Sequence, residues 1–247
     1  MTGELRVLPL PGIPEIEEGD DLAALLVDAA AGTGGLAEHD VLVVAQKVVS
    51  KEEGRVIRLD EVEPSAEARE LAGEEDPRRV EVILRESRRV VRSRPPLVIA
   101  ETPHGFVCAS AGVDSSNAKG PGTVVLLPLD PDASASRLRE RIGELTGHEV
   151  AVVVSDSFGR AWRTGTTDVA LGVAGMTALL DLRGTRDAVG YELHATQIAV
   201  ADEVAGAAEL VMGKVDGVPA AIVRGLHPSG DGRGSDLVMP AERDLFR

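Results

Sequence analysis

The sequence predicts an α+β fold in which mixed sheets pack against helices. Apolar strand patterns occur as neighbours between helical patterns, and the sustained strand–helix alternation of a doubly wound parallel sheet does not occur. The chain has 247 residues, of which 43% are apolar and 27% charged, and this composition is typical of a globular protein. Its length suits one large domain or two small ones.

The first third of the chain predicts strands separated by one capped helix. Residues 5–8 predict a strand, which a proline-rich loop ends. We expect Asp20 to cap the next helix, whose apolar side chains share one face: Leu22, Leu25, Leu26 and Ala29. Residues 40–45 are typical of a buried strand, and residues 55–59 predict a hairpin arm after a glycine turn.

Residues 65–91 predict helical structure. Asp76 and Pro77 have the pattern of an N-cap followed by a first-turn proline, and Glu81 and Arg85 are spaced as an i,i+4 ion pair. The arginines within residues 88–94 could bind phosphate. The favoured interpretation is an exposed helix face balanced by nearby glutamates, without a catalytic role.

The remaining elements continue the mixed pattern. Strands are predicted at residues 97–100, 105–111, 123–127, 150–154 and 220–223. A helix is predicted at residues 133–145, and a second one at residues 193–212 is rich in Ala and Val. We expect this second helix to be buried on nearly all sides.

Charge and cysteine content exclude several classes of protein. The formal net charge of −15 opposes binding to nucleic acid, which requires clustered Lys and Arg. The single cysteine, Cys108, lies in an apolar run, so we expect a buried, inert thiol and no intramolecular disulfide. Neither a targeting signal nor an apolar run of about 18 residues is apparent, which predicts a cytoplasmic protein without a membrane partner.

Common nucleotide and metal motifs are missing from the sequence. Gly213-Lys214 lacks the upstream glycine and the following hydroxyl of a P-loop, and the glycines of residues 230–234 suggest a flexible tail rather than a dinucleotide fingerprint. The five histidines have no metal-ligand spacing: His39, His104, His148, His194 and His227. Any bound metal should therefore have oxygen ligands.

Two carboxylate motifs stand out. Asp114 within residues 112–118 and Asp156 within residues 154–160 each follow an apolar run and are flanked by small polar residues. Carboxylate and hydroxyl oxygens at a sheet end suit Mg²⁺ or Mn²⁺, so the two motifs could converge on one ion. For either motif taken alone, a turn is the favoured interpretation, because Asp, Ser, Asn and Gly dominate turns.

These two motifs and four further segments resemble the coenzyme F420:L-glutamate ligase family. The further segments are residues 12–16, 50–55, 127–132 and 212–219, and the resemblance extends from about residue 8 to 226. It implies a ligase-like domain at residues 1–228 and a tail or linker at residues 229–247. Residues 236–247 of this tail resemble the segment that leads into a nitroreductase-like domain in two-domain actinobacterial relatives, a domain that we expect to be absent here.

The resemblance also implies a fold and an activity. The expected fold has two interlocked subdomains in an intertwined homodimer. The expected activity is GTP-dependent addition of L-glutamate to the glutamate-free precursor of the deazaflavin coenzyme F420, through an acyl phosphate, with extension into a γ-linked polyglutamate tail. Two alternatives stay open: another metal-dependent nucleotide ligase or phosphotransferase, and a catalytically silent binding domain.

Site residues follow from matching the family motifs position by position. GTP contacts are expected at Ile13, Pro14, Glu15, Ile16, Gln46, Lys47, Lys51, Asn117, Met212, Gly213, Lys214, Val215, Asp216, Gly217 and Val218. Mg²⁺ or Mn²⁺ is expected on Asp114, Asp156 and Ser157, with K⁺ as a further candidate ion. The catalytic residues are expected to be Lys51, Asp114 and Asp156.

The sequence departs from archaeal members of the family at three points. Lys214 stands where those members have a metal-binding Glu, the loop that contains Lys214 is one residue shorter, and Gln46-Lys47 replaces a small hydroxyl pair. An ammonium cannot ligate a cation, so Lys214 is either a phosphate contact or a solvated loop residue. Trp162, between Arg160 and Arg163, could contact an anionic substrate or pack over the dimer or domain core.

Overall fold

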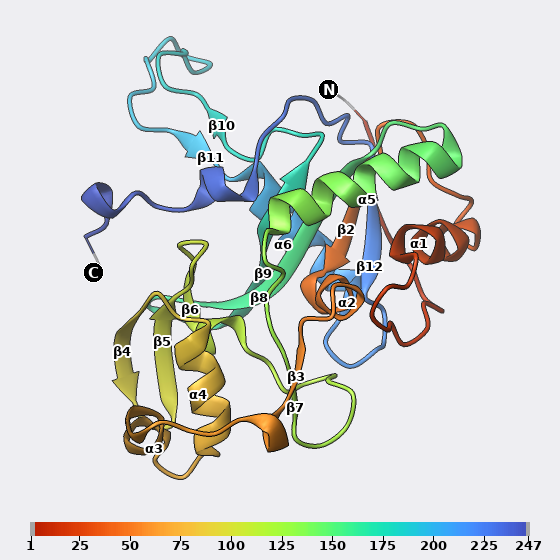
Figure 1. Ribbon diagram of the computed structural model, residues 1–247. Coiled ribbons are helices and arrows are strands. Elements are labelled where there is room, and N and C mark those ends of the chain that lie inside the picture. The colour runs from red at the N-terminus through yellow and green to blue at the C-terminus, as the bar shows by residue number, and fades with distance from the viewer. Residues whose placement is uncertain (1–2, 246–247) are drawn as a thin grey trace.

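The computed structural model describes residues 3–245 and is built around a five-stranded mixed sheet (Figure 1). The strand order is β1 (Arg6–Pro9), β12 (Ala220–Arg224), β2 (Val41–Ala45), β8 (Ala151–Arg160) and β9 (Arg163–Ala174). Strands β2 and β8 are parallel, and the other neighbours are antiparallel. The predicted α+β class with mixed sheets is confirmed.

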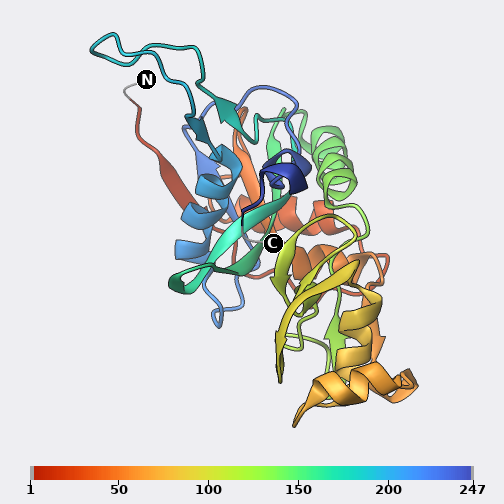
Figure 2. The same cartoon turned by 90° about the vertical axis from the view of Figure 1, so that its left-hand side faces the viewer.

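Helices cover both faces of this sheet. The central strands are buried on both sides, because Leu42 and Val44 of β2 face one core and Val41 and Val43 the other. The first core contains side chains of α1 (Leu22–Ala31) and α5 (Pro131–Thr146), and the second contains those of α6 (Val200–Met212). Figure 2 shows α6 on one side of the sheet and α1 and α5 on the other.

A second body, formed by residues 56–126, projects from the main sheet (Figure 1). Its core lies between helix α4 and two small sheets, with Val82 and Ile83 in one cluster with Val98, Ala100 and Val124. The elements are β3 (Val56–Arg58), α3 (Ala66–Ala72), α4 (Pro77–Arg85), β4 (Arg89–Arg94), β5 (Leu97–Glu101), β6 (Val107–Ala109) and β7 (Thr123–Val125). The interlocked subdomains and the intertwined homodimer stay predictions.

Shorter elements complete the chain. They are α2 (Gln46–Glu52), β10 (Leu180–Asp181), β11 (Gln197–Ile198) and the 3₁₀ turns η1 (Leu59–Glu61), η2 (Ser110–Gly112), η3 (Gly234–Leu237) and η4 (Ala241–Arg243). Helix α2 begins directly after β2 and ends where the chain enters the second body. Residues 55–59 are therefore not a hairpin arm of the preceding strand, because β3 pairs with β7 instead.

Helix caps follow the predicted chemistry with one correction. Asp21, and not Asp20, caps α1, accepting a hydrogen bond from Ala24 N at 3.1 Å, while Asp20 accepts one from Glu17 N. The Asp76 cap with proline in the first turn of α4 is confirmed. The i,i+4 pair is also confirmed, with Arg85 Nε 2.9 Å from Glu81 Oε1.

Two predicted helices are shorter in the structure. Residues 65–91 divide into α3 and α4, and residues 89–94 form strand β4, so the basic cluster is not a helix face. Arg89 instead pairs across the sheet with Glu101 at 2.7 Å. Helix α6 begins only at residue 200, after β11, and Leu210 is 86% exposed, so this helix is not buried on all sides.

Cys108 is buried, as predicted, and burial raises the pKa of its thiol to about 12.

The segment after β12 packs on the main body. Thr177 N donates a hydrogen bond to Ser229 O at 2.8 Å, and Gly234 N donates one to Asp132 Oδ1 at 2.6 Å. The domain division at residue 228 stays a prediction, and residues 1–2 and 246–247 lie outside the described part. No helix within residues 3–245 has both the length and the apolar character that a membrane crossing requires.

Candidate functional site

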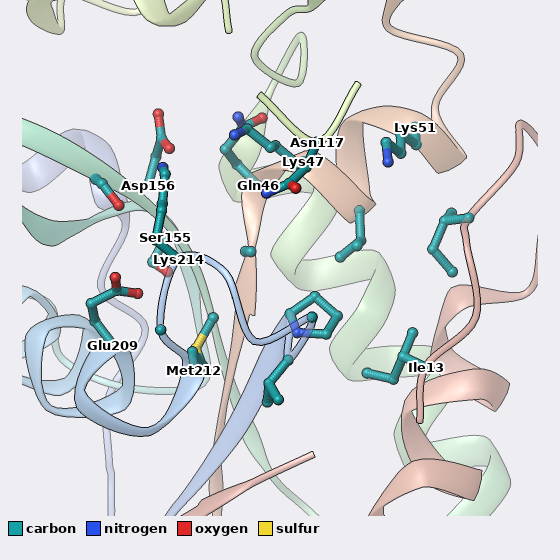
Figure 3. Close-up of a pocket in the computed structure, with 18 of the residues that line it drawn as sticks. Ile13, Gln46, Lys47, Lys51, Asn117, Ser155, Asp156, Glu209, Met212 and Lys214 are labelled. Carbon is teal, nitrogen blue, oxygen red and sulfur yellow. The ribbon is translucent and has the colours of Figure 1, made fainter. Parts of the chain in front are cut away.

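A cavity of about 270 Å³ opens where β2 ends beside β8, and most of the predicted site residues line it (Figure 3). The lining comes from five segments of the chain that are far apart in sequence. These are Ile13–Ile16 before α1, Ala45–Val48 with Lys51 around α2, Asn117 of the second body, Ser155–Ser157 with Asp168 on β8 and β9, and the end of α6 (Glu209 and Met212) with residues 213–214 and 217–219 that follow it.

Strand pairing explains why the cavity forms here. Strand β2 lies beside β8 in parallel up to the pair Ala45–Ser155, and the chain then turns into α2. Strand β8 continues past this point with only β9 beside it, so one edge of Asp156 and Ser157 is left open. Asp156 therefore lies within a long strand, whereas the sequence suggested that its strand ended before it.

Three predicted residues do not line the cavity. Val215 is 92% exposed, and Asp216 lies against Gly213 in the loop after α6. Asp114 belongs to the second body, where its backbone pairs with Val125 of β7. It reaches the cavity only through Lys47, whose Nζ lies 2.6 Å from Asp114 Oδ2.

Two lysines of α2 are fixed by carboxylates from other segments. Lys47 Nζ also donates to Ser116 Oγ at 2.7 Å, and Lys51 Nζ lies 2.5 Å from Glu15 Oε1. Burial acts to raise the pKa of Asp114, but the ion pair with Lys47 and hydrogen bonds from Ser116 hold it below its ordinary value. Figure 3 shows Lys47 beside Asn117 and Lys51 near the far end of the cavity.

The opposite wall is acidic. Burial raises the pKa of Asp156 to about 7, and Asp168 adds to this effect. A backbone hydrogen bond from Ser157 and the charges of Lys47 and Lys214 act in the other direction. Glu209 has its pKa raised by burial and by Asp168 as well. A cation in this part of the cavity would favour the ionised forms.

Sequence reasoning missed Asp168, although it is among the most buried charged residues near the cavity, at 4% exposure. Its Oδ2 accepts a hydrogen bond from Ser155 Oγ at 2.8 Å, and its Oδ1 accepts one from Ser157 Oγ at 2.6 Å. The register of β8 and β9, which pairs Ser157 with Asp168, creates both contacts. Glu209 was also missed, and no local pattern in the sequence marks either residue.

Gln46 belongs to the cavity lining and carries a buried donor without a partner in the part of the chain that the structure describes. The side chain is 1% exposed, and its Oε1 accepts a hydrogen bond from Ser50 Oγ at 2.8 Å. Its Nε2 has no partner among residues 3–245. A buried donor without an acceptor costs about 1–3 kcal/mol, so this atom indicates an acceptor supplied by a ligand or water.

The donors suit a hard cation only in part. Asp156 and Ser157 offer carboxylate and hydroxyl oxygens, which Mg²⁺ and Mn²⁺ accept. Within residues 3–245, however, no three His, Cys, Asp or Glu side chains form a group that could hold a metal. A bound ion would therefore take further oxygens from outside the chain, and the joint assignment to Asp114 and Asp156 stays a prediction.

Trp162 lies outside this cavity, at the turn between β8 and β9. Its backbone has φ of 57°, and the residue is 80% exposed. The interpretation that it packs over the core of its own domain is therefore wrong. The other two interpretations, contact with a substrate and contact in a dimer, stay predictions.

Comparison with known proteins finds one family. The model of the F420-0:Gamma-glutamyl ligase family matches residues 12–225. A coenzyme F420:L-glutamate ligase of Methanopyrus kandleri is 48% identical, covering 98% of each chain. An enzyme of the same name from Methanothermobacter thermautotrophicus is 44% identical over 98% of this chain and 99% of its own. Another, from Methanocaldococcus jannaschii, is 46% identical over 85% of each chain.

Proposed function

The chain belongs to the F420-0:gamma-glutamyl ligase family, and we propose that it joins L-glutamate to the glutamate-free form of coenzyme F420 in a GTP-dependent reaction. The observation that carries this proposal is the cavity at the end of β2. Five separated segments contribute to its lining, and each of them includes residues of a family motif. Gln46, which carries a buried donor without a partner among residues 3–245, also belongs to this lining.

The charge distribution supports a polyanionic co-substrate. The chain has a net charge of −15, yet Lys47, Lys51 and Lys214 all line this one cavity. Local cations of this kind determine the field inside a cleft, whatever the sign of the whole surface. We assign the phosphates of GTP to the lysine side of the cavity, where ammonium groups can neutralise their charge.

We infer that the reaction passes through an acyl phosphate. The terminal carboxylate of the coenzyme precursor attacks the γ-phosphorus of GTP, and GDP leaves. The amine of L-glutamate then attacks the acyl carbon, and phosphate leaves as the amide bond forms. In this scheme the protein positions the reactants and neutralises developing charge, and it needs no covalent enzyme intermediate.

The residues have distinct tasks in this proposal. Lys51, held by Glu15, and Lys47, held by Asp114, are oriented before substrates bind. Asp156 and Ser157 would hold Mg²⁺ or Mn²⁺, which when bound would neutralise charge on the nucleotide phosphates. Lys214 already exerts its charge on Asp156 and Glu209, and we assign it to phosphate neutralisation as well. K⁺ is a further candidate ion for the nucleotide site.

The product mass tests the proposed function. The purified chain is incubated with GTP, Mn²⁺ or Mg²⁺, L-glutamate and glutamate-free coenzyme F420, and the coenzyme is analysed by mass spectrometry. We expect an increase of one or more glutamyl residues, together with GDP and phosphate. Reactions with ATP in place of GTP, or without glutamate, serve as controls.

The same assay separates the alternatives. Release of GDP without a glutamyl increment would favour a phosphotransferase or a ligase of another acceptor. Binding of nucleotide without any turnover, under every metal and nucleotide condition, would favour a silent binding domain. Either result would overturn the proposed reaction.

A further inference from the structure

Two serine hydroxyls of β8 contact one buried carboxylate of the neighbouring strand β9. Ser155 Oγ and Ser157 Oγ each donate to a different oxygen of Asp168, at 2.8 and 2.6 Å. Asp168 lies on β9 and is 4% exposed, and Ser155 is 1% exposed. Both donors are neutral hydroxyls, so these contacts supply hydrogen bonds but no positive charge.

The direction of the Ser157 hydroxyl proton has a chemical consequence. A serine hydroxyl has one proton and two lone pairs, and hydrogen bonds to an ionised acceptor are short and strong. At 2.6 Å from Asp168 Oδ1, the proton of Ser157 points toward β9. Its lone pairs are thereby directed away from Asp168, which is the orientation that a cation-ligating hydroxyl needs.

The neighbourhood favours a cation on that side. Asp156 follows Ser155 in β8 and lines the same cavity as Ser157 and Asp168. Their carboxylate and hydroxyl oxygens are of the kind that Mg²⁺ and Mn²⁺ accept. An outer carboxylate that fixes the orientation of an inner ligand is a common feature of metal sites.

We propose that Asp168 is a positioning residue that accepts the hydroxyl protons of Ser155 and Ser157, so that Ser157 Oγ presents its lone pairs to the divalent ion beside Asp156. Asp168 itself does not contact the ion. This inference rests on the proposed function only for the presence of a divalent ion. It would stand for a chain that binds Mn²⁺ here and ligates a different substrate.

Binding of Mn²⁺ alone, without nucleotide or coenzyme, tests the role of Asp168. Free Mn²⁺ is followed by electron paramagnetic resonance during titration of the parent chain, Asp168→Asn, Ser157→Ala and the double variant. We expect Asp168→Asn to weaken Mn²⁺ binding by about 10-fold or more, the usual effect of losing an outer carboxylate. Unchanged affinity in the folded Asp168→Asn variant would overturn the proposal.

The double variant distinguishes positioning from direct ligation. If Asp168 acts through Ser157, combining Asp168→Asn with Ser157→Ala should add little. The Kd of the double variant for Mn²⁺ should lie within about twofold of the higher Kd of the two single variants. If Asp168 is itself a ligand, or acts only through its charge, the two losses should multiply. Multiplying losses would refute the positioning role.

Asp202→Asn is the matched control. Asp202 is a half-buried carboxylate on α6 that accepts a hydrogen bond from Ala170 N of β9 at 2.9 Å, and it does not line the cavity at the end of β2. Its variant should bind Mn²⁺ within about twofold of the parent, because Asp168 and both serines are untouched. If Asp202→Asn loses as much Mn²⁺ affinity as Asp168→Asn, removal of any carboxylate charge near β9 would explain the effect, and the proposal would fail.

Ser155→Ala provides a second route if Asp168→Asn does not fold. This change removes only the hydroxyl that holds Asp168 Oδ2. We expect a smaller loss, about threefold, because Asp168 keeps its bond to Ser157 but loses one of its two anchors. Unchanged Mn²⁺ affinity in Ser155→Ala would contradict the arrangement.

Discussion

At the scale of single residues, ion pairs between lysines and carboxylates organise the cavity. Lys47 lies between carboxylates from both bodies: it pairs with Asp114, and its charge also acts on Asp156. Lys51 pairs with Glu15 on the other side. Each ammonium is already oriented before a ligand binds. A polyanion such as a nucleotide phosphate would therefore be stabilised without reorganisation of these side chains, which is the condition for strong electrostatic stabilisation.

Removing either carboxylate charge should impair ligation. We expect Asp114→Asn and Asp156→Asn to fold and to lower the rate of glutamate addition by orders of magnitude, because each asparagine keeps the size but loses the charge. Added Mn²⁺ should restore little. Asp28→Asn, on the exposed face of α1, is the control and should retain parental rates. If both variants remain folded and ligate at near-parental rates, the assignment of a shared ion to the two residues is wrong.

Asp156 should also make the stability of the free chain depend on pH. Its folded pKa of about 7 exceeds the ordinary value of 3.8, so the folded state binds more protons than the unfolded state between these limits. The free energy of unfolding contributed by Asp156 therefore falls as pH rises from about 4 to 7. Without divalent ions, Asp156→Asn should be more stable than the parent at pH 8, by about 1–3 kcal/mol after allowance for solvent.

Thermal or denaturant unfolding at pH 4 and pH 8 measures this effect. The difference between Asp156→Asn and the parent should be small at pH 4, where both side chains are neutral. It should be large at pH 8, where only the parent carries the charge. A variant that is less stable than the parent at pH 8 would contradict the raised pKa.

At the scale of elements, the contact of β9 with the first turn of α5 depends on a glycine. A Cβ on Gly172 would lie 2.0 Å from Pro131 O and 2.9 Å from Asp132 N. Asp132 also accepts a hydrogen bond from Val173 N at 2.9 Å, which fixes the strand against the helix terminus. The contact is too close for any side chain, so the backbones would have to separate.

Gly172→Ala should therefore destabilise the fold. We expect a loss of about 2 kcal/mol or more in the free energy of unfolding, because the clash is with backbone atoms rather than a flexible side chain. Gly159→Ala on β8 is the matched control, since a Cβ there meets nothing within 4 Å. It should change stability by less than about 0.5 kcal/mol. Equal melting curves for the two variants would show that α5 and β9 can move apart freely.

At the scale of the whole molecule, the cavity lies where the main sheet meets the second body. Asp114 and Asn117 come from the second body, and Asp156 comes from the main sheet. Lys47, at the start of α2, connects the two through its ion pair with Asp114. The relative position of the bodies therefore determines whether the two carboxylate motifs can act on the same ligand.

We expect the chain to form a homodimer with substrate sites near the subunit boundary. Trp162 at the β8–β9 turn and Val189 and Tyr191 in the β10–β11 arm are large, exposed apolar groups, and such groups are often covered in an assembly. Light scattering across micromolar dilution measures the oligomeric state, with specific activity recorded in parallel. A monomer that retains full specific activity throughout would refute the dimer.

Several local features could be predicted because neighbouring residues determine them. The buried strand at Val41–Ala45, the Asp76-Pro77 helix start and the buried thiol of Cys108 all follow from apolar pattern, capping chemistry and composition. The motif segments that line the cavity could also be identified from the order of short patterns along the chain. These features depend on contacts within a few residues.

Other features were decided only by tertiary structure. The first half of strand β9, residues 163–168, has no apolar pattern, and it is stabilised by pairing with β8. That pairing brings Asp168 to Ser155 and Ser157, while the second body carries Asp114 to Lys47. The sequence determined which chemical groups were available. Backbone hydrogen bonding between distant strands decided which groups met, because a carboxylate on one strand finds its partners through the register of the next.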